Sequence, residues 1–249
     1  MKKIIFAGLL AALSAAQVFA GFTLTPFGGY TSVSMAQLNH RLDYIKTSMF
    51  GSSSLKDKKV SYFHDAWSAG LDAGYDFFSG FSAGLRSEFI GSGGYVYART
   101  IASVTEKSGV DANLIPVMAG ISYMLNWKGC PFTIGADAYA GVGFGKGGFF
   151  LNYYDRDNLE NLSIYVPMSG NCLVLDGALK AAYSFGRMFS INLSCGYRQA
   201  KFDKIFCDKD GTAYNANWQK GKEAKTLTGA TLAPDFSGLT AKLGGNISF

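Results

Sequence analysis

The chain has 249 residues, a net charge of +5, and 16% charged against 48% hydrophobic residues. Soluble domains carry about 25% charged residues, so this composition argues against an ordinary soluble domain. The positive charge is mild and gives no argument for nucleic acid binding.

The first twenty residues have the organisation of an export signal. A basic start at Lys2 and Lys3 precedes a short apolar run, and small residues close the segment. This order predicts a secretory signal peptide over residues 1–20, cleaved between Ala20 and Gly21. The apolar run is too short for a membrane anchor, because a spanning helix needs about 20 apolar residues.

The predicted mature domain, residues 21–249, keeps a net charge of +3 once the two signal lysines are removed. Glycine (31 residues) and aromatic residues (15%) are plentiful in the chain, and no stretch after the signal resembles a membrane helix. Only helices and closed barrels satisfy their backbone hydrogen bonds in lipid. A β-barrel is therefore the membrane fold that remains.

Alternation of apolar and polar residues with period two indicates eight strands. The facing of the first strand stays open, because Pro26, Gly28 and Gly29 interrupt its pattern. In the last segment Leu239, Ala241 and Leu243 fall on one side, while Thr240 and Lys242 fall on the other. The predicted strands cover about 22–34, 67–77, 81–91, 115–127, 132–144, 173–185, 189–201 and 239–249.

The connections between these strands alternate between short turns and long segments. The long ones cover 35–66, 92–114, 145–172 and 202–238. Outer-membrane barrels have an even number of strands, short periplasmic turns and long extracellular loops. We therefore predict an all-β fold, an eight-stranded antiparallel up-and-down transmembrane β-barrel. Aromatic residues beside the short turns are typical of an interfacial girdle.

The polar faces of the predicted strands carry few ionisable residues among many small ones. An exported lipocalin would also have eight strands, but its wet outer face would carry many lysines and glutamates. The nearly balanced charges instead suit a narrow lumen in which ions must be paired. The predicted lumen network is Asp72, Asp76, Arg86, Glu88, Asp137, Asp176, Lys180, Arg198 and Lys242.

Catalytic and metal-binding patterns are weak in this sequence. The histidines His40 and His64 fall in one predicted loop, near Asp43 and Asp65, and no motif places a nucleophile beside a base. The glycine-rich stretch 141–148 lacks the Ser or Thr that follows the lysine of a phosphate-binding loop. We expect no enzyme activity, no cofactor and no metal site.

Two of the four cysteines form a candidate disulfide. Cys172 and Cys207 fall toward the extracellular ends of adjacent predicted strands, and an exported protein permits a bridge there. Cys130 falls in a turn and Cys195 on the lipid face, so neither fits a common bridge.

The last strand resembles the C-terminal strand of bacterial outer-membrane proteins, because Phe249 ends it and apolar Ile247 and Leu243 precede it by two and six positions. In that family the strand is the signal that the barrel-assembly machinery recognises. The mature domain resembles the small outer-membrane barrels of the OmpA-transmembrane-domain, OmpX and OmpW types, and we expect it to lack the peptidoglycan-binding module of full OmpA proteins.

This resemblance implies export through the general secretory pathway, insertion as a monomer into the bacterial outer membrane, and contact with its lipid and lipopolysaccharide. It favours a structural or surface-interaction role, with loops whose ligand the sequence does not specify. A narrow channel for small or apolar solutes is the alternative, and a lipid-modifying enzyme is a minor one.

Overall fold

The computed structural model describes residues 21–44, 46–47, 55–78, 80–100, 104–127, 129–155, 160–186, 188–213, 216–225 and 231–249. The predicted signal peptide lies outside these residues. Within them, no helix is both long enough and apolar enough to cross a membrane.

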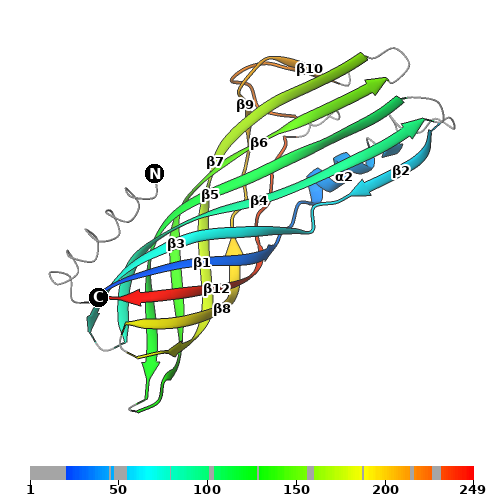
Figure 1. Cartoon of the computed structure of the whole chain (residues 1–249). Coiled ribbons are helices and arrows are strands. Elements are labelled where there is room, and N and C mark those ends of the chain that lie inside the picture. The colour runs from blue at the N-terminus through cyan, green and yellow to red at the C-terminus, as the bar shows by residue number, and fades with distance from the viewer. Residues whose placement is uncertain are drawn as a thin grey trace, which may run out of the picture.

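Eight antiparallel strands form a closed ring in the described part of the chain (Figure 1). Each strand pairs with the next one in the ring, and the last pairs with the first, as in the contact of Leu243 with Gly28. The predicted fold class is therefore confirmed. The ring consists of β1 (Phe22–Ser32), β3 (Asp65–Phe78), β4 (Phe81–Thr100), β5 (Val104–Asn126), β6 (Phe132–Asp155), β7 (Glu160–Ser184), β8 (Phe189–Gln199) and β12 (Gly238–Ser248).

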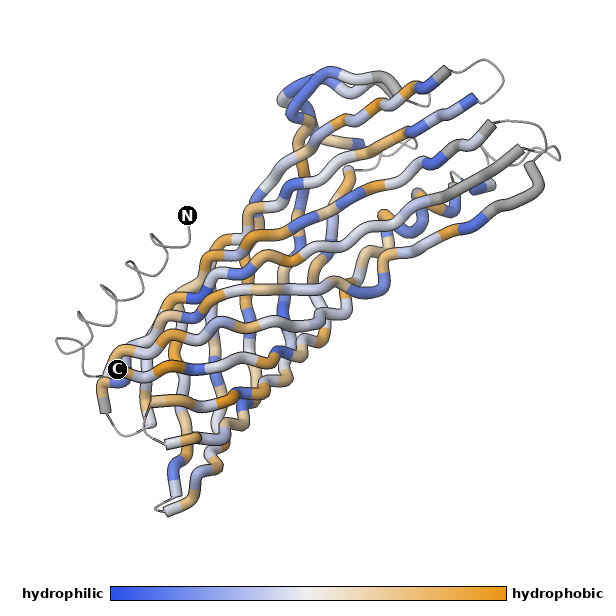
Figure 2. Tube along the Cα trace, viewed as in Figure 1, coloured by the Kyte–Doolittle hydropathy of each residue, from blue (hydrophilic) through white to orange (hydrophobic). Residues whose placement is uncertain are grey.

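Side chains alternate between the two faces of the ring. Large apolar residues such as Leu179 and Leu85 point outward and are 73% and 61% exposed, whereas Arg86 and Asp176 point inward and are buried. Figure 2 shows this alternation of apolar and polar residues along the strands. A polar interior with an apolar outer face is the arrangement of a transmembrane barrel, the reverse of a lipocalin.

Four strands are much longer than a membrane requires. A spanning strand needs about 9–11 residues, but β6 has 24 and β7 has 25. The predicted loops 92–114 and 145–172 are therefore mostly strand, and the prediction of long loops there was wrong. The outward apolar side chains form a belt around the barrel. Beyond this belt, on the wall side, the apolar side chains face inward, as those of Val110, Ala112 and Leu114 do, and the outward side chains are mostly polar.

The extended strands form one tall wall. At the upper end β2 (Leu55–Ser61) pairs with β4, so the wall runs in the order β2, β4, β5, β6 and β7. Strands β1, β8 and β12 end lower, which leaves the opposite side of the barrel short (Figure 1). We call the two ends of the molecule the wall end and the turn end, the latter holding the short turns.

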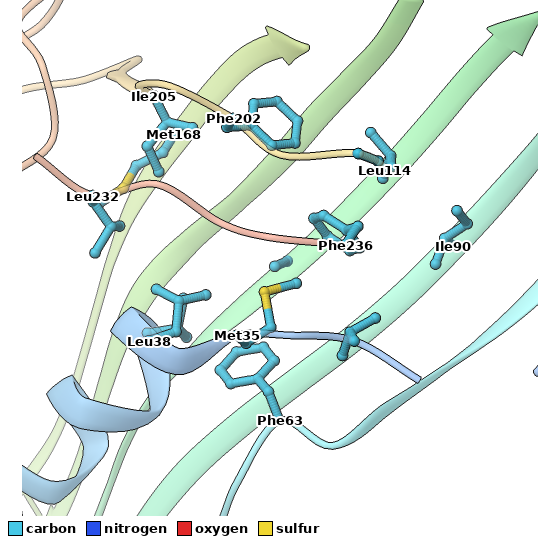
Figure 3. Close-up of a cluster of buried hydrophobic side chains, with 14 of the residues drawn as sticks. Met35, Leu38, Phe63, Ile90, Leu114, Met168, Phe202, Ile205, Leu232 and Phe236 are labelled. Atoms are coloured by element: carbon cyan, nitrogen blue, oxygen red, sulfur yellow. The ribbon is translucent and has the colours of Figure 1, made fainter. Parts of the chain in front are cut away.

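Parts of the two other predicted loops, 35–66 and 202–238, fold over the inner face of the tall wall, while β2 extends the wall itself. They contain α2 (Ala36–Tyr44), β2, β9 (Phe206–Cys207), β10 (Gly211–Ala213) and β11 (Ala216–Trp218). Their apolar side chains join those of the wall in one buried cluster (Figure 3). We call the segments 33–44 and 200–237 the cap. The cap lies over the wall end of the lumen.

Candidate functional site

The lumen is crossed by a layer of ion pairs with two centres. At the first centre, the Arg86 guanidinium donates two hydrogen bonds to Asp72, at 2.7 and 2.9 Å, and one to Asp137, at 3.0 Å. Strands β3, β4 and β6 supply these residues, so one arginine ties three strands together across the bore.

At the second centre, Arg198 and Lys242 share two carboxylates. Arg198 donates to Glu88 and, at 2.7 Å, to Asp176. Lys242 donates to Asp176 at 2.8 Å and lies 3.6 Å from Glu88. A weaker contact of 3.6 Å between Arg86 and Asp176 joins the two centres.

Aromatic rings fill the space around the charged groups. The Arg86 guanidinium lies 3.9 Å from the centre of the Tyr139 ring, and the Lys242 ammonium lies 5.4 Å from that of Phe27. Gly120 makes room for Tyr139, because a Cβ atom on Gly120 would lie 2.5 Å from that ring. Side chains therefore fill the lumen at this level, as the width of an eight-stranded barrel permits.

Two residues of the predicted network lie elsewhere. Asp76 and Lys180 line a polar chamber of about 540 Å³ below the layer, at the turn end. Its other lining groups include the hydroxyl residues Thr25 and Ser122 and the amide residue Asn246. Seven of the nine predicted residues are thus brought together in the layer, and these two are not.

Above the layer the cap closes the lumen with apolar side chains. Phe202 and Phe236 are each 1% exposed, and α2 contributes Leu38 (Figure 3). The Phe202 ring lies against Gly145 on the inner face of β6, where any larger residue would collide with it. A cavity between cap and wall, lined by Leu38, Phe202 and Phe236 among others, is about 30 Å³, far below the 150 Å³ that holds a benzene-sized ligand.

Hydrogen bonds fix the cap to the barrel. The Asn39 side chain donates to the Phe63 carbonyl and accepts from the Phe63 amide, at 2.9 and 2.8 Å. The Ala233 amide donates to the Gln37 side chain at 3.0 Å, which joins the two cap segments. The cap was not predicted from the sequence. The signal that indicates it is the run of inward-facing apolar residues beyond the lipid-facing belt, such as Val110, Ala112 and Leu114.

The remaining candidate residues form no catalytic or metal constellation. His40 and His64 are exposed, and Asp43 accepts a hydrogen bond from the Tyr62 hydroxyl at 2.5 Å. This hydrogen bond raises the pKa of Tyr62. No group of three or more metal-ligating residues occurs within the described ranges.

The candidate disulfide is absent from the structure, where Cys172 and Cys207 are both free. Cys207 pairs with Met168, four residues from Cys172 along β7. Four residues of strand span about 13 Å, beyond the separation of about 7 Å that a bridge tolerates.

The residues of the predicted assembly signal lie on β12 and directly after it. Leu243 faces outward and is 59% exposed. Ile247 is half-buried, and Phe249 lies 6.1 Å from the ring of Phe22. Ala20 lies outside the described residues, while the Gly21 amide donates to the Phe249 carbonyl at 3.0 Å.

A closed antiparallel ring with an apolar outer belt and a charged, filled interior defines a small β-barrel of the outer-membrane type. No protein-family model and no curated protein matches the chain.

Three solved structures show how far the chain path is shared. The outer membrane protein OprG from Pseudomonas aeruginosa is 14% identical, over 93% of this chain and 97% of that one, with a TM-score of 0.45. The Ail protein of Yersinia pestis is 14% identical, over 93% and 100%, with a TM-score of 0.40. Neisserial surface protein A is 9% identical, over 92% and 98%, with a TM-score of 0.37. By their printed names they are an outer membrane protein, an attachment invasion locus protein and a surface protein, and these roles stay their own.

Proposed function

We propose that this protein is a closed barrel of the bacterial outer membrane with a structural or surface-interaction role, the turn end facing the periplasm and the tall wall facing outward. The observation that carries the proposal is the ion-pair layer. Arg198 is 0% exposed and Arg86 is 3% exposed, so the middle of the lumen leaves no path for solutes.

The cap supports the same conclusion from the wall end. A conduit needs a continuous path, but buried apolar side chains of the cap pack on the wall, and the cavity lined by Leu38, Phe202 and Phe236 is about 30 Å³, enough for one or two water molecules. The polar chamber at the turn end is therefore a blind vestibule. The long strands lift the cap and the outer wall above the membrane, where they are accessible to partners.

A narrow channel for small or apolar solutes is the competing proposal, and solute uptake distinguishes the two. The folded chain is reconstituted into lipid vesicles, and osmotic swelling is measured in solutions of a pentose, an amino acid and a larger sugar. The closed barrel predicts swelling rates equal to those of protein-free vesicles for each solute. Faster swelling that depends on solute size would establish a conduit and contradict the closed barrel.

Recognition by the barrel-assembly machinery and the monomeric state stay predictions. Closure of the ring supports the monomer, because the membrane-embedded strands have no unpaired edge through which copies could join.

A further inference from the structure

We infer that the outer face of the tall wall binds the phosphorylated saccharide of lipopolysaccharide molecules in the surrounding outer leaflet. The inference rests on the outer-membrane placement proposed above. We call this face the saccharide surface and define it by Tyr95, Lys107, Lys146, Phe150 and Tyr165.

The saccharide surface begins where the apolar belt ends. On β6 the outward apolar row ends at Phe144, and Lys146 is the next outward residue. In the register of the sheet Lys146 is opposite Asn113 on one side and Ser169 on the other. This change from apolar to polar side chains marks the level of the lipid head groups.

A shallow groove opens on the outer face at the same level. Its volume is about 540 Å³, and Tyr30, Trp67 and Phe89 line it together with Gly91 and Gly93. The Trp67 and Phe89 rings lie 5.2 Å apart, so they form one aromatic side of the groove. Gly91 is covered by the Phe89 and Trp67 rings, whereas Gly93 is exposed and lets a flat sugar ring approach the backbone there.

Three aromatic residues form a platform higher on the wall. Tyr95, Phe150 and Tyr165 lie in one row of the sheet, with Gly109 between the first two. A Cβ atom on Gly109 would lie 2.8 Å from Phe150, and one on Gly148 would lie 2.7 Å from Tyr165. The Phe150 and Tyr165 rings therefore lie over glycines, against the wall, and Tyr165 is still 50% exposed. The row is four residues above Lys146, or about 13 Å along the strand.

Lysines supply the positive charge of this face. The Lys107 ammonium lies 4.3 Å from the centre of the Tyr95 ring and 5.8 Å from that of Phe150. Lys59 lies on the same face, because it is opposite Tyr97, which is opposite Lys107. Within the described residues, neither Lys107 nor Lys146 forms an ion pair with a carboxylate.

Three aspartates on or beside this face already accept hydrogen bonds from hydroxyl groups. Asp65 accepts from Tyr30 at 3.1 Å, Asp111 accepts from Tyr165 at 3.2 and 3.3 Å, and Asp208 accepts from Ser169 at 2.6 Å. Burial and Asp111 together raise the pKa of Tyr165 to about 12, so its hydroxyl remains a donor at neutral pH. The lysines are thus the charges that remain for an anionic ligand.

Along the membrane normal, these features follow the same order as the parts of a lipopolysaccharide molecule. Lipopolysaccharide places acyl chains in the membrane, phosphates at its edge and sugars above it, all in the leaflet that surrounds this barrel. The apolar belt, Lys146 with the groove, and the aromatic platform with Lys107 follow in the same order. Sugar rings have apolar faces that stack on aromatic rings, and ammonium groups attract phosphates.

The test measures binding of the folded full chain, immobilised in detergent micelles, to two probes. One is purified lipopolysaccharide with a complete core, and the other is lipid A alone. We expect the complete molecule to bind at least about tenfold more tightly than lipid A, because only it reaches the platform. The double variant Lys107→Ala/Lys146→Ala is expected to lower the affinity for the complete molecule about 30-fold.

Control variants separate charge from fold. Lys204→Ala removes an exposed lysine of the cap and should leave binding unchanged, while Lys107→Arg/Lys146→Arg should retain it. Tyr165→Ala should weaken binding of the complete molecule and leave lipid A unaffected. Heat-modifiable gel mobility first establishes that each variant is folded.

Three results would overturn the inference: no binding by the parent chain, equal affinity for the complete molecule and lipid A, or an unchanged affinity in the double lysine variant. None of these results bears on solute uptake, so a failure here is distinct from a failure of the closed-barrel proposal.

Discussion

Replacement of Arg198 by methionine tests whether the ion-pair layer stabilises the barrel. The Arg198 side chain is fully buried and donates to both Glu88 and Asp176. Without it, the nearest cation to Glu88 is the Lys242 ammonium at 3.6 Å. Three cations and four carboxylates form the layer, so its formal charge falls from −1 to −2.

Removal of one partner from a buried ion pair costs about 3–5 kcal/mol, because the other charge stays buried without compensation. We expect Arg198→Met to lower the free energy of unfolding by about that amount. The double variant Glu88→Gln/Arg198→Met removes the stranded carboxylate and should recover at least half of the loss.

The assay is equilibrium unfolding by urea in lipid vesicles, followed by tryptophan fluorescence and by heat-modifiable gel mobility. Gln199→Met is the matched control, because Gln199 is the next residue of β8 and is exposed. It should shift stability by no more than about 0.5 kcal/mol. The reasoning is refuted if Arg198→Met is as stable as the control, or if the double variant is less stable than the single one.

Three further predictions concern the belt, the cap and the thiols. Leu243→Arg places a charge on the lipid face and should cost about 2–4 kcal/mol in the same assay; a silent substitution would mean that Leu243 does not face lipid. Phe202→Ala removes a fully buried ring and should weaken the cap by about 3–5 kcal/mol, so protease added outside the vesicles should cleave residues 200–237 faster than in the parent. Unchanged cleavage would show that the cap does not depend on this ring. Burial and Asp208 raise the pKa of Cys207, so at neutral pH its thiol should react with iodoacetamide more slowly than that of the exposed Cys130. The reaction rate of Cys207 should rise at alkaline pH. An intact mass two hydrogen atoms below that of the fully reduced chain would instead reveal a disulfide.

The membrane-spanning half of the barrel could be predicted from the sequence because one physical rule governs it. Lipid outside and ion pairs inside impose strict alternation, as in β12, where Leu243 faces out and Lys242 faces in. The predicted strand at 239–249 differs from the observed Gly238–Ser248 by one residue at each end. The charged residues of the layer were identified for the same reason, since ionisable groups on a spanning strand must face the lumen.

The tall wall could not be predicted because a different rule applies there. Above the belt water replaces lipid, so outward residues such as Asp111 become polar, and the inner face becomes apolar against the cap. Along β5 the apolar residues thus change from even positions, as at Leu114, to odd positions, as at Val117. In the sequence this change of pattern has the appearance of a strand end. In β6 the glycines 143–148 suggest a loop, but in the structure Gly145 and Gly148 accommodate the rings of Phe202 and Tyr165.

The cap depends on contacts between segments far apart in the sequence. Gln37 and Ala233 are 196 residues apart and share a hydrogen bond. Local alternation carries no information about such a contact. The separation of Asp76 and Lys180 from the ion-pair layer has a similar cause. The height of each side chain along the barrel axis depends on the stagger of the strands, and only the pairing register of the strands defines that stagger.

Single-channel recording in planar lipid bilayers directly tests whether the ion-pair layer and the cap close the lumen. We expect the inserted, folded chain to give no steady conductance at moderate voltage, at a salt concentration at which an open barrel conducts. Insertion is confirmed in the same preparation by heat-modifiable mobility and by protease protection of the spanning strands. Reproducible unitary conductance from this folded protein would contradict the closed lumen.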